Sequence, residues 1–332
     1  MTLSRHAAPE WFTTFPSALM LSLGMAAAAV ASPAFWQVEW PHTDFDTLLV
    51  DPTEIISGGP PKDGIPALSN PVFASAGSET GLGEHEPVIS VEIENEFRAY
   101  PIRYLLWHEI VNDRVGGMPI AVTYCPLCNS GVVYDARLND RELTFGVTGK
   151  LRHSDMIMYD RETESWWQQA IGQAIAGELS GEELTAIPAL TVSWGEYMAM
   201  AGTDAKVMQE PKHVLRPYGA NPYVGYDTAD RPFLYNGENP PHGIHPLARV
   251  VRIGDQAWPL ERLRIEGMVS ESGYELTWNS GQVSPLDQRN INDSRDIGTV
   301  RALSAGEPVA HDLLFAFAFH AFFPEGQWML GN

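Results

Sequence analysis

The chain is short of cysteine and of basic residues, and both shortages narrow its possible functions. Its 332 residues include only two cysteines, and 21 lysines and arginines are outnumbered by 42 aspartates and glutamates. The formal net charge of −21 would repel a phosphate backbone, which argues against nucleic acid as a partner. The sequence also lacks a Gly-rich dinucleotide fingerprint, a P-loop and a serine nucleophile elbow. Any redox chemistry must therefore take its electrons from a partner protein, a metal or the substrate.

Long apolar runs are scarce after the first residues. The run over residues 15–31 is rich in Leu, Met and Ala and ends with Ala29-Val30-Ala31. This ending is typical of a signal peptide, residues 1–31, cleaved after Ala31; an uncleaved membrane anchor is the alternative. The later run LLFAFAFHAFF, residues 313–323, is too short to cross a bilayer and predicts a buried strand. We expect a periplasmic or secreted protein, without a stable membrane span after cleavage.

Glycine and proline, in contrast, are abundant, with 29 and 25 copies. A turn-rich chain favours β structure and ordered loops over helix bundles. We predict a mainly β (α+β) fold: an extended N-terminal arm over residues 32–85, and one large β-rich core domain over residues 86–326.

An internal repeat divides this predicted core. RAYPIRYL (98–105) is echoed by QAWPLERL (256–263), and each copy follows an alternating segment that predicts a strand. We therefore expect a pseudo-duplicated strand-turn-helix-strand unit, with repeats over about residues 86–210 and 248–326. A long ordered loop, residues 211–247, would join them. The second repeat has no cysteine.

Both cysteines lie in CPLC, between the strand-like PIAVTY and the turn and strand of NSGVVYD. A disulfide across two residues closes almost no loop, so a structural staple gains little stability. A thioredoxin-type pair would need a helix N-terminus, which this strand context does not offer, so the fold should not be thioredoxin-like. The context resembles half of a metal knuckle, but a closed zinc site needs four ligands.

Two sets of residues could complete a site around Cys125 and Cys128. A thiol redox enzyme would use the two cysteines as nucleophile and resolving thiol. Its other catalytic groups would be His108 and Glu109, as base or orienting groups, with Asp155 in support. The pocket would be formed by Tyr124, Asp160, Trp166 and Trp167. A metal site would add His153, Met156 and Met158, a soft ligand set that suits copper. A third possibility is a non-catalytic binding module in which CPLC forms a reducible disulfide.

Several long motifs carry a resemblance to a known family. WHEIVND, GGMPIAVTYCPLCNSGVVYD, LTFGVTGKLRHSDMIMYDRETESWWQQ and FAFAFHAFFP are similar to a large prokaryotic family of secreted proteins catalogued as a domain of unknown function. The resemblance covers about residues 86–326. Some members of that family are selenoproteins, which implies redox chemistry. His153 departs from the family pattern, where a smaller polar residue is common, and this weakens it as a required ligand. The resemblance brings no established activity beyond this. We expect an oxidoreductase and, because the cofactor motifs named above are missing, an electron-transfer partner protein or a small-molecule substrate.

Overall fold

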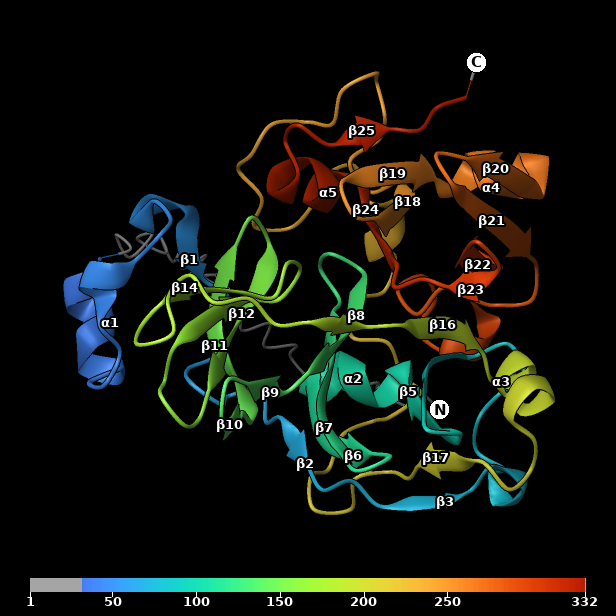
Figure 1. Cartoon of the computed structure of the whole chain (residues 1–332), viewed down its shortest axis with the longest axis horizontal. Coiled ribbons are helices and arrows are strands. Elements are labelled where there is room, and N and C mark those ends of the chain that lie inside the picture. Colours follow the sequence, from blue (N-terminus) through green and yellow to red (C-terminus); the bar gives the residue numbers. More distant parts are fainter. Residues whose placement is uncertain (1–31, 332) are drawn as a thin grey trace, which may run out of the picture. The chain divides into compact units, whose positions relative to one another are not determined.

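The computed structural model describes residues 32–331 (Figure 1). The expected signal peptide, residues 1–31, lies outside the described residues. Strands make up 38% of the structure and helices 17%, in a single domain of small sheets arranged like a β-propeller, which confirms the mainly β prediction. None of the helices in the described part of the chain is long and apolar enough to cross a membrane.

The first repeat forms two neighbouring sheets. Their strand orders are β16-β4-β5-β17-β3 and β15-β8-β7-β6-β2. The elements are β4 (Pro87–Ile93), β5 (Glu96–Pro101), α2 (Ile102–His108), β6 (Ile110–Val115), β7 (Met118–Cys125), β8 (Ser130–Asp135), β15 (Ala186–Ile187), β16 (Ala189–Ser193), α3 (Trp194–Ala201) and β17 (Lys206–Met208).

The second repeat forms the same arrangement. Its sheets have the orders β24-β18-β19-β25 and β20-β21-β22-β23. The elements are β18 (Arg249–Ile253), β19 (Gln256–Pro259), α4 (Leu260–Glu266), β20 (Met268–Glu271), β21 (Tyr274–Asn279), β22 (Thr299–Ser304), β23 (Glu307–Pro308), β24 (Asp312–Phe315), α5 (Ala316–Phe322) and β25 (Gln327–Trp328). In both repeats the second strand pairs parallel with the last. The predicted duplication is therefore confirmed.

The repeated Ala-aromatic-Pro motif sets the same turn twice. Pro101 and Pro259 precede α2 and α4 with φ/ψ of −59/127° and −57/127°, because the pyrrolidine ring fixes φ near this value. Each helix then ends on a residue with positive φ, which is Glu109 in the first repeat and Gly267 in the second. The two units thus match residue by residue from the strand through the helix.

A further sheet is inserted into the first repeat between β8 and β15. Its order is β1-β11-β12-β13-β14, and the segment also carries the hairpin β9 (Arg137–Leu138) and β10 (Arg141–Glu142). The sheet strands are β1 (Ile55–Ser57), β11 (Phe145–Arg152), β12 (Asp155–Asp160), β13 (Trp166–Gln168) and β14 (Gln173–Ala176). By its sequence alone, the motif TESWWQQAIGQAI, residues 163–175, predicts a short helix or a covering loop. It instead forms β13 and most of β14, because Trp166 and Trp167 pack into different apolar clusters on the two faces of the sheet.

The run over residues 313–323 is the second correction. Only its start belongs to β24, and the rest forms α5. In the first repeat α3 likewise follows β16, so α5 occupies the repeat's helical position. The alternation of Phe and Ala predicts a strand, but a short apolar run can be buried as a strand or as a helix, and tertiary packing decides between them.

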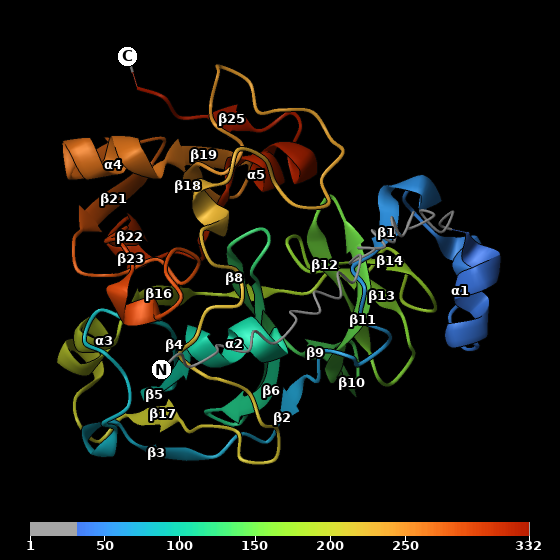
Figure 2. The same ribbon diagram turned by 180° about the vertical axis from the view of Figure 1, so that it is seen from behind.

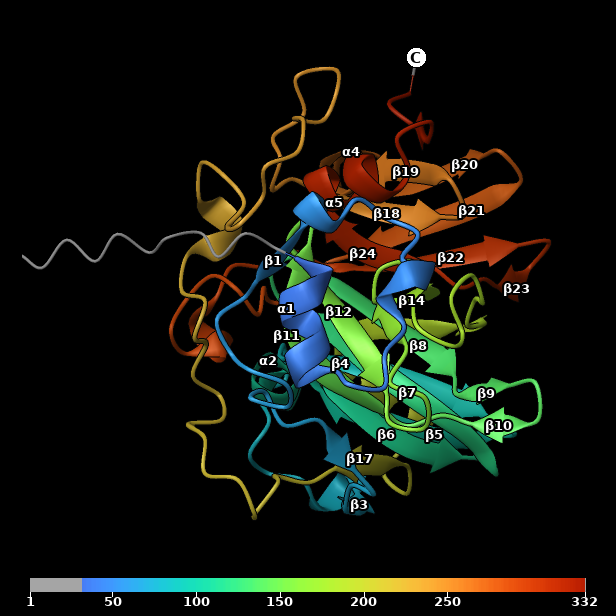
Figure 3. The ribbon, with the colours of Figure 1, turned by 90° about the vertical axis from the view of Figure 1, so that its left-hand side faces the viewer.

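The N-terminal segment, expected to be an extended arm, contributes structure to three sheets. It contains α1 (Pro33–Glu39) and η1 (Phe45–Thr47), which pack on the inserted sheet (Figure 3). It continues through η2 (Pro52–Glu54), β1, β2 (Leu68–Ser69), β3 (Phe73–Ser75) and η3 (Ala76–Ser78). The three strands pair with β11, β6 and β17.

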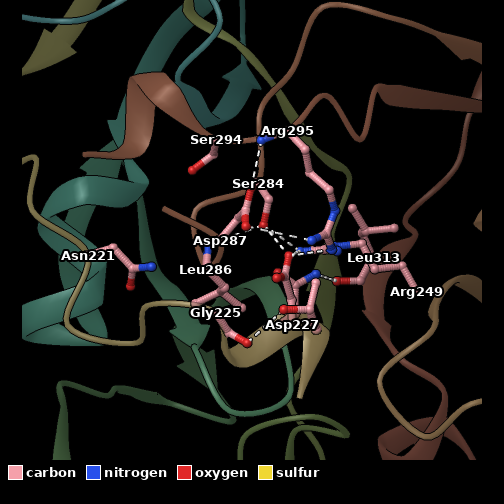
Figure 4. Close-up of polar contacts among 12 residues, drawn as sticks. Asn221, Gly225, Asp227, Arg249, Ser284, Leu286, Asp287, Ser294, Arg295 and Leu313 are labelled. Atoms are coloured by element: carbon pink, nitrogen blue, oxygen red, sulfur yellow. Dashed lines mark hydrogen bonds and ion pairs between the residues drawn. The ribbon is translucent and has the colours of Figure 1, made fainter. Parts of the chain in front are cut away.

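The loop over residues 211–247 joins the repeats and contains only η4 (Tyr226–Thr228). It runs past α2 towards the second repeat (Figure 2). At its centre, Asp227 accepts hydrogen bonds from Arg249 at 2.7 Å and from Ser284, and Arg295 lies 2.8 Å away (Figure 4). Ser284 and Arg295 belong to the connection between β21 and β22, which also contains η5 (Ile291–Asp293). A buried ion cluster therefore ties the linker to the second repeat.

A buried dithiol and carboxylate site

The cysteines lie in a tight turn between β7 and β8. Cys125 is the last residue of β7 and pairs with Ser130, the first residue of β8. Asn129 has a φ of 52°, a conformation that asparagine tolerates better than most residues. Both thiols are free and almost fully buried. The strand context expected for CPLC is therefore present.

One strand of the second repeat, β24, holds this turn from outside. Phe315 at the end of β24 donates its backbone N–H to the carbonyl of Cys128 at 2.8 Å. The amide of Asn129 donates to the carbonyl of Leu313 at 3.0 Å, while Tyr124 donates its hydroxyl to the oxygen of that amide at 3.2 Å. Tyr124, expected to line a pocket, thus stabilises the cysteine turn.

The inserted sheet brings Asp155 to the cysteines. Ligand atoms of Asp155, Cys125 and Cys128 all lie within 4.8 Å of one another, and all three side chains are buried. One carboxylate oxygen of Asp155 accepts hydrogen bonds from Gln168 at 2.6 Å and from the backbone N–H of Ala170 at 2.9 Å. The other oxygen, Oδ1, has no hydrogen-bond partner in the described chain. This oxygen is available to the thiols or to a bound cation.

Glu109 lies at the end of α2 beside this group. Its backbone carbonyl accepts the N–H of Tyr124 at 2.8 Å, which fixes its place next to the end of β7. Its side chain is buried, and its carboxyl makes no hydrogen bond within the described residues. Burial, followed by the charge of Asp155, raises the pKa of Glu109 to about 8. At neutral pH most of this carboxyl is therefore protonated.

The other three acidic groups also hold their protons more tightly than usual. Burial raises the pKa of Asp155 to about 6, although its hydrogen bonds oppose the shift. Burial likewise raises the pKa of both Cys125 and Cys128, and the charge of Asp155 adds to the effect. Among the described residues, no lysine or arginine is a main cause that lowers the pKa of any of these four groups. The site is a buried acidic cluster that can hold protons or a cation.

His108 has its hydrogen bonds elsewhere. Its Nδ1 lies 2.7 Å from the carbonyl of Pro66, and its Nε2 lies 2.6 Å from the hydroxyl of Tyr218 in the linker loop. Burial lowers the pKa of His108, which favours the neutral ring. Both nitrogens are therefore used to join the N-terminal segment, α2 and the linker, and neither is directed to the cysteines.

The other predicted pocket residues divide between two faces of the inserted sheet. Asp160 accepts hydrogen bonds from the indole of Trp167 at 2.9 Å and from the backbone of Thr163 at 2.6 Å. Trp167 belongs to the same apolar cluster as the cysteines. Trp166 packs instead against Trp36 of α1 in a separate cluster. Asp160 is thus bonded within its own hairpin and Trp166 packs on α1, whereas Trp167 shares the apolar cluster of the cysteines.

The expected metal ligands do not all converge either. Nε2 of His153 lies 3.4 Å from a carboxylate oxygen of Glu54, and its ring packs against Phe322. Met156 and Met158 are buried in the cluster that contains both cysteines. The ligand set that the structure brings together is Cys125, Cys128 and Asp155.

Sequence reasoning missed the residues that hold Asp155 and those that enclose the turn. Gln168 directly follows the Trp pair in the motif TESWWQQA and Ala170 comes two residues later, so their nearness to Trp166 and Trp167 in the sequence was the available signal. Tyr223 and Tyr226 come from the linker, and Tyr226 donates its hydroxyl to the carbonyl of Leu127 at 3.0 Å. Only the path of the loop in space could identify them.

Comparison with known proteins gives the family. Residues 62–326 match the family described as Protein of unknown function (DUF3179), and the chain belongs to it. No curated protein and no solved structure matches the chain.

Proposed function

We propose that this member of the DUF3179 family is an extracytoplasmic thiol redox protein in which Cys125 and Cys128 alternate between dithiol and disulfide. The observation that supports it is the carboxylate of Asp155, which lies within 4.8 Å of both sulfurs and has one oxygen without a partner. The location outside the cytoplasm is inferred from the signal-like residues 15–31.

Asp155 has the properties needed to accept a proton from a thiol. Thiolate is the nucleophile in disulfide exchange, yet burial raises the pKa of both cysteines and keeps them protonated. A pKa of about 6 leaves Asp155 mostly ionised at pH 7. A base at this position, within reach of the sulfurs, would relieve the barrier that burial creates.

The exchange balances with a partner disulfide. One cysteine, deprotonated by Asp155, attacks a partner sulfur, whose S–S bond breaks to leave a thiolate. The second cysteine then loses its proton and attacks the mixed disulfide, so that the S–S bond of Cys125 and Cys128 forms. The two electrons and two protons of the dithiol end on the two partner sulfurs, and the reverse sequence reduces the pair.

Thiol chemistry in defined variants tests the proposal. We expect Ellman titration of the wild type to find two thiols after reduction and none after equilibration with oxidised glutathione, with neither change in Cys125→Ser/Cys128→Ser. In Asp155→Asn, loss of the negative charge should lower the pKa of Cys125. Disulfide formation at pH 7 should nevertheless slow by about tenfold or more because the base is lost.

Asp160→Asn is the matched control, since Asp160 is a buried carboxylate on the same strand with hydrogen bonds to Thr163 and Trp167. It should leave the oxidation rate within about twofold of the wild type. Equal rates in Asp155→Asn and the wild type would remove Asp155 from the mechanism. A disulfide that resists reduction would favour the binding module with a structural bridge.

A second candidate function is binding of a soft metal ion by Cys125, Cys128 and Asp155. The supporting observation is the closeness of three buried ligand atoms, which all lie within 4.8 Å of one another. Thiolates suit copper(I), and a carboxylate oxygen could complete the set. Titration of the reduced protein with copper(I) would show about one equivalent bound tightly, lost in the double serine variant. Retention of one tight equivalent by that variant would exclude the cysteines as ligands.

A further inference from the structure

A pocket of about 480 Å³ lies beside the cysteine turn, within the size range of small-molecule sites. Its lining is mostly apolar or aromatic, and includes Ile65, Leu127, Val147, Met156, Tyr223 and Phe233. Leu127 is one of the two residues between the cysteines. Val224 and Phe233 also line the pocket, with 53% and 57% of their surfaces exposed. The pocket is thus suited to an apolar molecule.

Two polar side chains in this lining, Glu109 and Tyr223, have no hydrogen-bond partner within residues 32–331. Lys150 lines the pocket, but its amino group lies 3.0 Å from a carboxylate oxygen of Glu39. Glu109 lines it too, is only 8% exposed, and makes no hydrogen bond through its carboxyl within residues 32–331. A buried polar group without a partner costs free energy. The pocket therefore presents two hydrogen-bonding groups that have no partner within residues 32–331, the carboxyl of Glu109 and the hydroxyl of Tyr223.

The backbone at this position adds a second cost. Glu109 has φ 58° and ψ −32°, and Gly267 has φ 74° and ψ −46° at the same position of the second repeat. This region lies outside the left-handed helical basin and is strained for any residue with a Cβ. The second repeat shows that glycine satisfies the fold here. A strained, buried and unpartnered glutamate in its place indicates a functional requirement.

We infer that this pocket binds an uncharged organic molecule with an apolar body and one strongly accepting oxygen, to which the carboxyl of Glu109 donates a hydrogen bond. A carbonyl and a sulfoxide share this chemistry. A protonated carboxyl is a donor, and the raised pKa of Glu109 keeps it protonated at neutral pH. Binding of this molecule goes beyond the proposed thiol exchange, whose partner is a disulfide, and does not depend on it.

Binding is measured on Cys125→Ser/Cys128→Ser, so that failure of the redox proposal cannot affect the result. The probes are methyl p-tolyl sulfoxide, p-methylacetophenone, methyl p-tolyl sulfide and p-methylbenzylamine. Their binding is measured by ligand-observed NMR titration at pH 7. We expect the sulfoxide or the ketone to bind about tenfold more tightly than the sulfide, which lacks the oxygen. The oxygen-bearing probe that binds more tightly shows whether the accepting oxygen belongs to a sulfoxide or to a carbonyl group.

Two variants in this background separate recognition from structure. Glu109→Gly should raise the midpoint of thermal unfolding by about 2 °C by relieving strain, while abolishing the preference for the oxygen-bearing probe. Glu109→Gln keeps an N–H donor and should retain most of that preference. The inference is overturned if no probe binds, if the sulfide binds equally well, if the cationic amine binds most tightly, or if Glu109→Gly keeps the preference.

Discussion

The two repeats form the same hairpin, but the connection between its two strands differs in length and in what it contacts. In the first, β7 and β8 are joined by residues 126–129, and the turn holds the cysteines. In the second, β21 and β22 are joined by residues 280–298, a long connection that reaches Asp227 and the linker. The inserted sheet that supplies Asp155 has no counterpart between β22 and β23, which are linked by Ala305 and Gly306.

The comparison indicates how one unit can provide either chemistry or support. β7 is buried along nearly its whole length, whereas β21 is largely exposed or half-buried. Enclosure of the first repeat by the inserted sheet and the linker creates a buried site in which the pKa values of carboxyls and thiols rise. The second repeat lacks that enclosure and instead braces the first through β24 and the ion cluster.

Breaking the ion cluster should give the largest effect on stability. Asp227→Ala leaves the guanidinium of Arg249 buried without its main counter-charge, and loss of one partner of such a pair costs about 3–5 kcal/mol. The free energy of unfolding, measured by urea denaturation, should fall by this amount. The rate at which the folded protein forms its disulfide should not change if the second repeat serves only as support.

Glu261→Ala is the control for Asp227→Ala, since it removes an exposed ion pair with Arg264 from the same repeat. Such pairs contribute about 0.5 kcal/mol. Equal losses in the two variants would show that the buried cluster has no special structural weight.

The sequence predicted the repeated unit but not the residues that converge on the cysteines, and the difference has a physical cause. The motif with Pro101 and Pro259 predicted the repeated unit, because proline fixes local geometry that does not depend on distant contacts. The convergence of Asp155 on the cysteines, and of Tyr226 on Leu127, depends on the insertion and the linker, whose paths are set by tertiary packing. For the same reason His108 could not be separated in advance from its neighbour Glu109. The ring of His108 bonds to Pro66 and Tyr218, whereas the side chain of Glu109 lines the pocket.

The pH dependence of stability should expose the cost of burying Glu109. Its pKa rises from 4.5 in a model peptide to about 8 in the folded protein, so the folded state binds the proton more tightly. Stability is therefore highest below the unfolded pKa and is lost as pH rises towards 8. At about 1.4 kcal/mol per pKa unit, the loss by pH 7 is at most about 3 kcal/mol. Glu109→Gln cannot titrate and should escape it.

The measurement is the difference in unfolding free energy between Glu109→Gln and the wild type at several pH values. The difference should grow in favour of the variant from pH 4.5 to pH 8, whatever the other carboxylates contribute, since they are common to both proteins. A difference that stays constant with pH would show that Glu109 ionises normally and is not enclosed as described.

The smallest predicted effect tests the backbone strain at the helix end, where the first repeat has Glu109 and the second has Gly267. At Gly267 an added Cβ would have no heavy atom within 4 Å, so Gly267→Ala tests backbone conformation without a steric clash. With φ at 74° and ψ at −46°, alanine should lower the free energy of unfolding by about 2 kcal/mol. Thiol oxidation should be unchanged, because the second repeat has no reactive residue here. If Gly267→Ala is neutral, this backbone region accepts a side chain freely, and Glu109 must be explained by its burial and missing hydrogen bond alone. If Gly267→Ala instead proves destabilising while Glu109→Gly proves stabilising, the backbone is strained for a side chain at the same position of both repeats. Glycine then relieves that strain in the second repeat, whereas Glu109 keeps it in the first, where the residue faces the pocket.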